Sequence, residues 1–299
     1  MRKITSQMVE KFREYLYEEE KSTTTAKKYI CDLNKLIIYA GEQELTKKLV
    51  ISYKESLQSS KKYKSNSINS FLVAINCFFQ FMGWEDLRVK TIKIQKKTFM
   101  PDNRELSKEE YKKLVTTAEK ARKIKLAMII QTLCAMGLRI SELASITVKS
   151  INSGIVIVYC KGKERHILIP KALQNKLLYY IHKNGITSGP VFCTRTGKPI
   201  DRSNIWREMK SLCKESGVEP EKVFPHNLRH IFAKTFYSTC KDIAKLADIL
   251  GHSSIETTRI YIMTTSKEYQ KQIDEMGLVT GKWGVHRWQN RVQKQKITT

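Results

Sequence analysis

The sequence predicts a mainly α-helical protein with a small β-sheet, divided into two domains. A length of 299 residues suits about two domains. Apolar residues recur at helical spacing through most of the chain, and the 41% apolar content is enough for ordinary cores. Only residues 155–160 and 166–169 form a pair of β-branched runs, joined by the charged sequence KGKER, which is typical of a hairpin.

Residues 1–95 are expected to form a domain of four helices. Apolar stripes predict the first helix around Phe12, the second after a Ser22 cap, the third over 49–57 and the fourth from Asn66 or Ser67 to about Gly83. Five lysines on loops and outer faces are candidate DNA contacts, with a merely solvated surface as the alternative. They are Lys27, Lys28, Lys61, Lys62 and Lys64.

Residues 96–104 lack periodicity and contain Pro, Asp and Asn, so we expect a linker there. A second domain, residues 105–276, opens with a Ser107–Glu110 capping box. Helices are expected to about Met136, then a break at Gly137 and a short helix over 138–143. After the hairpin, the pattern predicts helices over 171–182 and 202–215 and a short strand over 191–194. The basic tail, 277–299, either packs on a neighbouring protomer through Trp283 or Trp288 or is frayed.

The stretch from Pro225 to Tyr261 carries the densest chemistry. Its first helix begins at Pro225 and places His226 and Arg229 one turn apart. The next ends at Gly251, and a predicted Ser253–Glu256 capping box opens the helix that carries Tyr261. An imidazole, a guanidinium, a second imidazole at His252 and a phenol could together attack a phosphate.

Other interpretations of this stretch stay open. The two helices around Gly251 could be a helix-turn-helix that reads DNA, and Tyr261 could be a core aromatic. His226 and His230 have the spacing of a zinc pair, but Asn227 replaces the glutamate of that motif and Arg229 would repel a dication.

The overall charge points to a polyanionic partner. Fifty-four Lys and Arg residues against 29 acidic residues give a net charge of +25, which favours nucleic acid over charge for solubility alone. The seven cysteines are widely spaced, as in reduced cytosolic proteins. Without a signal-peptide pattern or an apolar run near the ~20 residues of a membrane span, we expect a cytoplasmic, nucleoid-associated protein that does not bind membranes.

Five motifs follow one another in a fixed order: GLRISEL at 137–143, the charged hairpin, HNLRH at 226–230, LGH at 250–252 and Tyr261. This ordered set resembles the tyrosine recombinase family, which includes phage integrases and Xer-type enzymes. The resemblance covers nearly the whole chain. It implies an N-terminal four-helix core-binding domain and a mixed α/β catalytic domain.

The resemblance also implies site residues. The catalytic set is Arg139, Lys161, His226, Arg229, His252 and Tyr261. Tyr261 matches the nucleophile, the arginines match those that hold the non-bridging oxygens, and Lys161 matches the acid for the leaving 5′-oxygen. Cys160 stands where the family hairpin usually has glycine, so Lys163 is an alternative acid. Glu142 matches an acidic residue that orients the site, His230 is expected to form a hydrogen bond behind Arg229, and His166 is expected to be an ordinary strand residue.

The chemistry of such a site is consistent with these residue types. A phenol with a pKa of about 10 is ionised in roughly one molecule in a thousand at pH 7, a cost of about 4 kcal/mol that nearby cations and a base can offset. Guanidinium forks suit the charge that gathers on the phosphorane. No metal, nucleotide or other cofactor is then expected.

The expected partners are double-stranded DNA with specific recombination sites and further copies of the chain, in a homo-tetramer that passes through a Holliday junction. Accessory DNA-bending proteins are candidate partners as well. A mobile-element integrase is the favoured role. A chromosome dimer resolvase of the Xer type, a type IB topoisomerase and a non-catalytic DNA-binding regulator are the alternatives.

Overall fold

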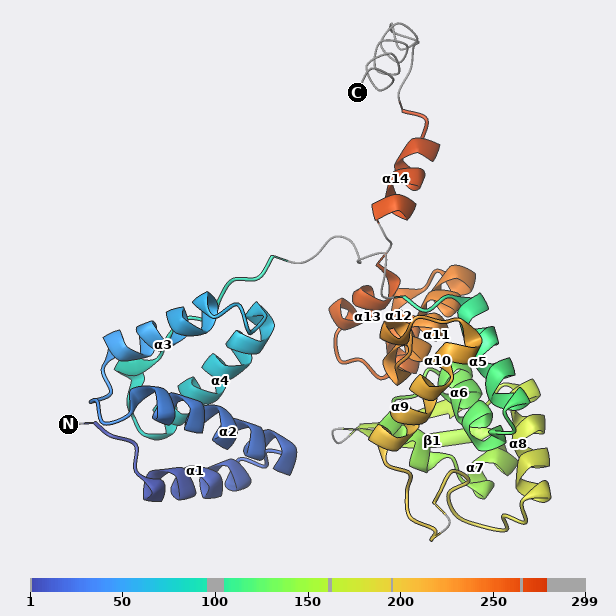
Figure 1. Ribbon diagram of the computed structural model, residues 1–299, viewed down its shortest axis with the longest axis horizontal. Coiled ribbons are helices and arrows are strands. Elements are labelled where there is room, and N and C mark those ends of the chain that lie inside the picture. The colour runs from blue at the N-terminus through green and yellow to red at the C-terminus, as the bar shows by residue number, and fades with distance from the viewer. Residues whose placement is uncertain (1, 96–104, 161–162, 195, 264–265, 279–299) are drawn as a thin grey trace, which may run out of the picture. The chain divides into compact units, whose positions relative to one another are not determined.

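The computed structural model describes residues 2–95, 105–160, 163–194, 196–263 and 266–278 (Figure 1). The chain divides into two compact units, Met1–Lys97 and Thr98–Thr299. The predicted linker, 96–104, and most of the predicted tail lie outside the described residues. Within the described ranges, no helix is long and apolar enough to cross a membrane.

The first unit is helical, as predicted. Its elements are α1 (Ser6–Glu18), α2 (Thr23–Ala40), α3 (Lys47–Ser59), α4 (Ser65–Phe81) and the 3₁₀ turn η1 (Glu85–Leu87). The hydroxyls of Thr5, Ser22 and Thr46 accept backbone N–H bonds at the starts of the first three helices. A core of aliphatic and aromatic side chains, among them Phe12 and Phe78 with rings 5.2 Å apart, holds these helices together.

Helix α4 differs slightly from the prediction and organises the segment that follows it. It begins at Ser65 rather than at Asn66 or Ser67, and no side chain caps it. The Asn69 side chain accepts from the backbone N–H of Ile92 and donates to the carbonyl of Ile92. The Asn76 side chain makes the same two bonds with the backbone of Val89. These four bonds hold the segment after η1 against α4.

The second unit begins with α5 (Lys108–Lys120), where the predicted Ser107–Glu110 capping box is present. Helix α6 (Ile124–Met136) follows and is apolar on almost every side, which suits its position in the core. Gly137 ends it with φ of +61°, in the left-handed region. The predicted short helix over 138–143 is instead a 3₁₀ helix, η2 (Ile140–Ser145), followed by α7 (Val148–Ser153).

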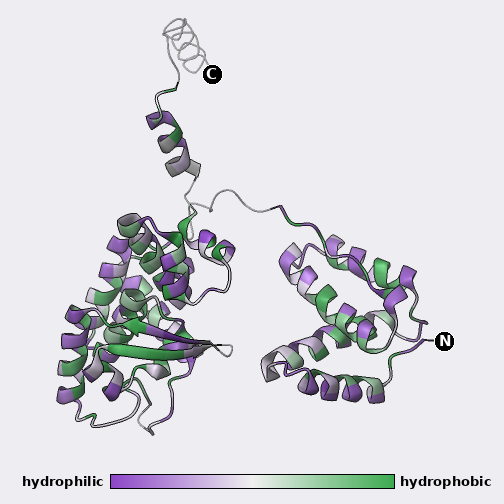
Figure 2. Ribbon diagram, turned by 180° about the vertical axis from the view of Figure 1, so that it is seen from behind, coloured by the Kyte–Doolittle hydropathy of each residue, from purple (hydrophilic) through white to green (hydrophobic). Residues whose placement is uncertain are grey.

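The small sheet consists of β1 (Ile155–Cys160) and β2 (Lys163–Leu168), paired antiparallel with Ile155 opposite Leu168. Strand β2 begins at Lys163 and not at His166, because Glu164 and Arg165 pair with Tyr159 and Val158. The charged residues were not recognised as strand because they lack the apolar signal. Figure 2 shows this contrast, with β1 green and most of β2 purple.

The strand predicted over 191–194 is wrong. Residues 190–193 contribute only isolated bridges, Pro190 with Thr147 and Cys193 with Pro199, in an otherwise irregular segment. The helix predicted over 202–215 is split at Leu212 into α9 (Arg202–Ser211) and α10 (Cys213–Ser216).

The remaining helices surround α6 or build the C-terminal part of the unit (Figure 1). They are α8 (Lys171–Lys183), the 3₁₀ turn η3 (Pro220–Lys222), α11 (Pro225–Cys240), α12 (Ile243–Leu250), α13 (Ile255–Ile262) and α14 (Ser266–Glu275). The packing of α11 on α6, and of α12 and α13 on α11, brings distant parts of the sequence together.

Candidate active site

Helix α11 carries the centre of the site. Proline at its first position suits a helix start, and the side chain of Asn227 donates to the Lys222 carbonyl at 2.7 Å just before it. Because the helix packs on α6, Arg229 is directed into the protein and is only 1% exposed. His226, one turn earlier, stands at the solvent-exposed rim.

Arg229 joins the C-terminal ends of two helices. Its Nη1 donates to the Gly137 carbonyl and its Nη2 to the Leu250 carbonyl, each at 2.6 Å. The last carbonyls of a helix lack partners within the helix and carry partial negative charge, so a guanidinium stabilises both ends. Burial and the nearby charge of Arg139 lower the pKa of Arg229 to about 10, which leaves it a cation at pH 7.

Tyr261, near the end of α13, reaches the same place. Its hydroxyl lies 3.1 Å from Nε2 of His226, and its ring centroid lies 5.9 Å from the guanidinium carbon of Arg229. The ring itself is buried in a small apolar cluster with Leu246 and Leu250. Tyr261 is therefore a core aromatic by its ring and a polar site residue by its hydroxyl.

His252 follows Gly251, whose φ of +64° ends α12. Its Nε2 lies 2.9 Å from Arg229 Nη2, and its Nδ1 lies 2.9 Å from the hydroxyl of Thr258. A guanidinium can only donate, so Nε2 accepts, and we assign the ring proton to Nδ1. Burial and the charge of Arg229 lower the pKa of His252 to about 4, so the ring is neutral at pH 7.

Arg139 approaches from the turn after α6. The buried carboxylate of Glu142 accepts from the Arg139 backbone N–H at 2.8 Å and from its Nη1 at 3.0 Å. Glu142 therefore holds both the backbone and the side chain of Arg139, which is half-buried. Glu142 therefore contacts Arg139, while the orienting role that was expected for it stays a prediction.

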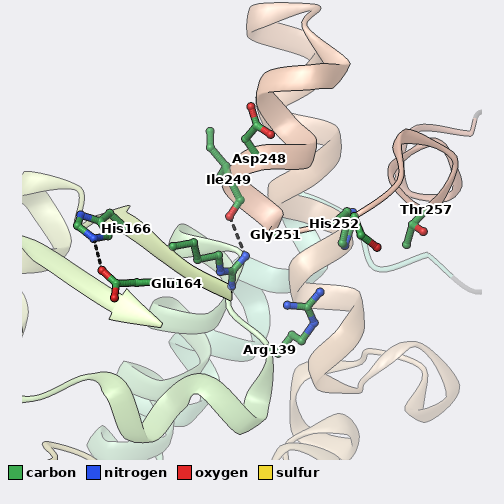
Figure 3. Close-up of a pocket in the computed structure, with 10 residues that line it drawn as sticks. Arg139, Glu164, His166, Asp248, Ile249, Gly251, His252 and Thr257 are labelled. Carbon is green, nitrogen blue, oxygen red and sulfur yellow. Dashed lines mark hydrogen bonds and ion pairs between the residues drawn. The ribbon is translucent and has the colours of Figure 1, made fainter. Parts of the chain in front are cut away.

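A cavity of about 880 Å³ opens beside these residues (Figure 3). Arg139, Arg165 and His252 line it, together with the carboxylates of Glu164 and Asp248. Figure 3 shows Arg139 and His252 near one another although they come from different elements. Two of the lining residues, Arg139 and Arg165, carry guanidinium groups, which suit an anion with several oxygens, such as a phosphate diester.

The structure places five of the predicted catalytic residues in one site. They are Arg139, His226, Arg229, His252 and Tyr261. Lys161 lies outside the described residues. Lys163 is the first residue of β2, and only its backbone is described.

The expectation for His230 was only partly right. The residue lies on α11 behind the site, but its ring packs 4.4 Å from the ring of Tyr261, and its buried Nδ1 has no hydrogen-bond partner in the part of the chain that the structure describes. The predicted Ser253–Glu256 capping box is also wrong, because α13 begins at Ile255 and the cap is Ser254. His166 is a strand residue, as expected, and pairs with Glu164 at 2.7 Å.

Two residues of the site were not predicted. Thr258 is completely buried and holds His252, while Arg165 on β2 contacts Glu142. Arg165 belongs to the charged hairpin, whose sequence indicated a functional segment but not this residue. No motif in the sequence pointed to Thr258. Among the residues that the structure describes, no group of three His, Cys, Asp or Glu side chains could hold a metal ion.

The five lysines proposed as DNA contacts are all exposed on the first unit. Lys27 and Lys28 lie on α2, and the other three lie between α3 and α4. A further lysine, Lys35, lies 4.1 Å from the ring centroid of Phe71 and pairs with the buried carboxylate of Asp32, as Lys28 does. Lys28 and Lys35 are therefore held by Asp32, and DNA contact by the five predicted lysines stays a prediction.

A phenol next to a neutral imidazole and a buried guanidinium suits attack on a phosphodiester, whose negative charge grows during the reaction. The geometry thus indicates the class of enzymes that cut nucleic acid strands by covalent catalysis.

The comparisons with known proteins identify the family. Residues 104–268 match the Phage integrase family, and residues 9–86 match the N-terminal SAM-like domain of phage integrases. The chain is 30% identical over 285 residues to tyrosine recombinase XerA of Pyrococcus furiosus, covering 92% of this chain and 96% of that protein. It is 25% identical over 287 residues to tyrosine recombinase XerD of Vibrio cholerae, covering 90% and 95%.

A solved structure shares the fold. The crystal structure of XerH site-specific recombinase bound to palindromic difH substrate, a post-cleavage complex, superposes with a TM-score of 0.69 at 17% identity, covering 90% of this chain and 84% of that one. The chain therefore belongs to the phage integrase family of tyrosine recombinases, enzymes that cut and rejoin DNA.

Proposed function

We propose that the protein exchanges DNA strands at specific sites by making Tyr261 a temporary covalent partner of DNA. The observation that carries this proposal is the 3.1 Å contact between the Tyr261 hydroxyl and His226 Nε2, next to buried Arg229. The surrounding protein and the charges of Arg229 and Arg139 lower the pKa of His226, so its ring is a neutral acceptor at pH 7.

In the cleavage step, the Tyr261 oxygen forms a bond to phosphorus and its proton passes to His226. The guanidinium groups of Arg139 and Arg229 balance the negative charge on the non-bridging oxygens, and His252 accepts a hydrogen bond from Arg229. The bond from phosphorus to the 5′-oxygen breaks, and the leaving oxygen takes a proton from Lys161, with Lys163 as the alternative. The products are a 3′-phosphotyrosyl link and a free 5′-hydroxyl. Rejoining is the reverse reaction with a 5′-hydroxyl from another strand.

Because one tyrosine cuts one strand, exchange of both strands between two duplexes requires four tyrosines. We therefore propose a homo-tetramer on two DNA sites, acting through a Holliday junction at the nucleoid, with or without accessory DNA-bending proteins. The relatives named XerA and XerD favour the Xer-type resolvase over the mobile-element integrase as the biological role.

Covalent trapping tests the chemistry. Binding to the wild-type protein would first select a recognition sequence from a pool of random duplexes. A nicked suicide version of this selected duplex should form a protein–DNA adduct that survives SDS. The Tyr261→Phe variant should bind the duplex and form no adduct, whereas Tyr237→Phe, which changes a half-buried tyrosine in the same apolar cluster, should form it.

Two outcomes would favour the alternatives. An adduct that persists in Tyr261→Phe would reject this nucleophile, and binding without any adduct in the wild type would favour a non-catalytic regulator. A topoisomerase would relax supercoiled DNA without exchanging strands between two sites.

A further inference from the structure

Arg165, on β2, connects three segments that are distant in sequence. Its side chain is only 11% exposed. Nη2 donates to Oε2 of Glu142 at 2.5 Å, and Nη1 donates to the Ile249 carbonyl at 2.8 Å. The latter bond is visible in Figure 3 as the dashed line to Ile249. One side chain thus joins the hairpin to η2 and to the last turn of α12.

The carboxylate of Glu142 is shared between two guanidinium groups. Oε1 accepts from Arg139 and Oε2 accepts from Arg165, while the carboxylate itself is 5% exposed. A buried carboxylate with two such partners has a fixed orientation, because each oxygen has its own charged donor. The position of the hairpin is therefore tied to the position of Arg139.

The turn that carries His252 is shaped around Arg165. A Cβ atom added to Gly251 would lie 2.8 Å from Cδ and 3.1 Å from Nη1 of Arg165. A side chain at this position is therefore excluded by the contact with Arg165 as well as disfavoured by the φ of +64°. Arg165 consequently contacts the segments that position both Arg139 and His252.

We propose that Arg165 is a positioning residue for DNA cleavage. Its planar fork fixes β2, and so the lysine-bearing hairpin, relative to the Arg139–Glu142 pair and the end of α12. Lysine cannot replace it, because a single ammonium group lacks two donors in a rigid fork. This inference rests on the proposed function, in which a hairpin lysine protonates the leaving 5′-oxygen.

The test compares two leaving groups in single-turnover cleavage. One selected duplex carries the natural phosphodiester, and the other has sulfur in place of the bridging 5′-oxygen. A thiol has a pKa of about 8.5, so a thiolate leaves without a proton donor, whereas an alkoxide needs one. Arg165→Lys should cut the natural duplex about 100-fold more slowly than the wild type, because a displacement of about 1 Å costs that much. On the sulfur duplex the loss should be about tenfold smaller, since the acid is no longer required and only the contacts of Arg165 with Glu142 and with the turn at Gly251 are still missing.

Arg165→Gln provides a second variant, and thermal unfolding shows which variants are folded. Arg207→Lys, an exposed arginine on α9, is the matched control and should cut both duplexes at the wild-type rate. Equal losses on the two duplexes, or no loss on the natural one, would overturn the role of Arg165. Failure of the wild type to form an adduct on either duplex would instead overturn the proposed function, and this inference with it.

Discussion

The histidines of the site differ from ordinary surface histidines because they are held neutral. Burial lowers the pKa of His230 and of His252 to about 4 in each case, with nearby positive charges adding to the effect. A neutral ring at His252 can accept the hydrogen bond from Arg229, and a neutral ring at His226 can accept the phenolic proton. Both functions would be lost if the rings were protonated.

Stability should therefore fall as the solution becomes acidic. The unfolded chain protonates His230 near pH 6.5, whereas the folded protein keeps the ring neutral down to about pH 4. The unfolded state thus binds more protons within this window, so the free energy of unfolding decreases as pH falls from 6.5 toward 4. The free energy of unfolding should therefore fall between pH 6.5 and pH 5 by about 2 kcal/mol less in His230→Gln than in the wild type.

Urea denaturation of both proteins at pH 7, 6 and 5 measures this effect. Identical pH dependence in the wild type and in His230→Gln would contradict it. The comparison at pH 7 serves as the control, because it reports any change in packing that is independent of protonation.

Residue types and spacing predicted the polar residues of the 225–261 stretch but not their partners. His226 and Arg229 are neighbours within one helix, so helical periodicity was enough to place them together. Arg165 donates to a carbonyl 84 residues away, and Thr258 acts only through His252. Contacts of this kind depend on tertiary packing, which local patterns do not contain.

Turns and helix ends position the site at the scale of secondary structure. Gly137 ends α6 and presents its carbonyl to Arg229. The break at Gly137 was predictable because glycine suits a left-handed helix end. The 3₁₀ form of η2 was not predictable, because it depends on the pairing of Glu142 with Arg139. The early start of β2 was not predictable either, because it depends on cross-strand pairing of charged residues.

Gly137→Ala should damage both stability and cleavage. A Cβ atom there would lie 2.5 Å from the ring of Phe232. We expect a loss of about 2–4 kcal/mol, of which about 1 kcal/mol is the left-handed backbone and the rest is overpacking. Gly217→Ala is the matched control, since Gly217 has φ of +66° and an added Cβ there would have no atom of the described residues within 4 Å. Chemical denaturation should show a clearly larger loss for Gly137→Ala, and equal losses would rule out the steric argument.

Asp32 in the first unit should contribute more to stability than surface acids do. It is 2% exposed and pairs with Lys28 and Lys35. Asp32→Ala should lower the free energy of unfolding by about 2 kcal/mol, because hydrogen bonds to a buried charged group are lost. Asp86→Ala removes an exposed pair with Arg2 and should cost less than about 1 kcal/mol. Thermal unfolding measures the loss of stability in each variant relative to the wild type. A smaller loss for Asp32→Ala than for Asp86→Ala would refute the expectation.

Over the whole molecule, the chain combines a basic helical unit with a unit that gathers its site from residues far apart in sequence. Each unit has its own hydrophobic core, so helical periodicity could predict most of the architecture. The site is assembled from η2, β2, α11 and the α12–α13 turn. Its central feature is a phenol whose hydroxyl faces an imidazole beside a buried cation.

The most direct test of this account locates the covalent bond itself. The trapped adduct would be digested with nuclease and trypsin and examined by mass spectrometry. Cleavage after Arg259 and Lys267 releases the peptide 260–267, whose one tyrosine is Tyr261. The account predicts that this peptide carries a nucleotide joined through its 3′-phosphate to the Tyr261 oxygen. A nucleotide attached to any other residue, or joined through a 5′-phosphate, would contradict it.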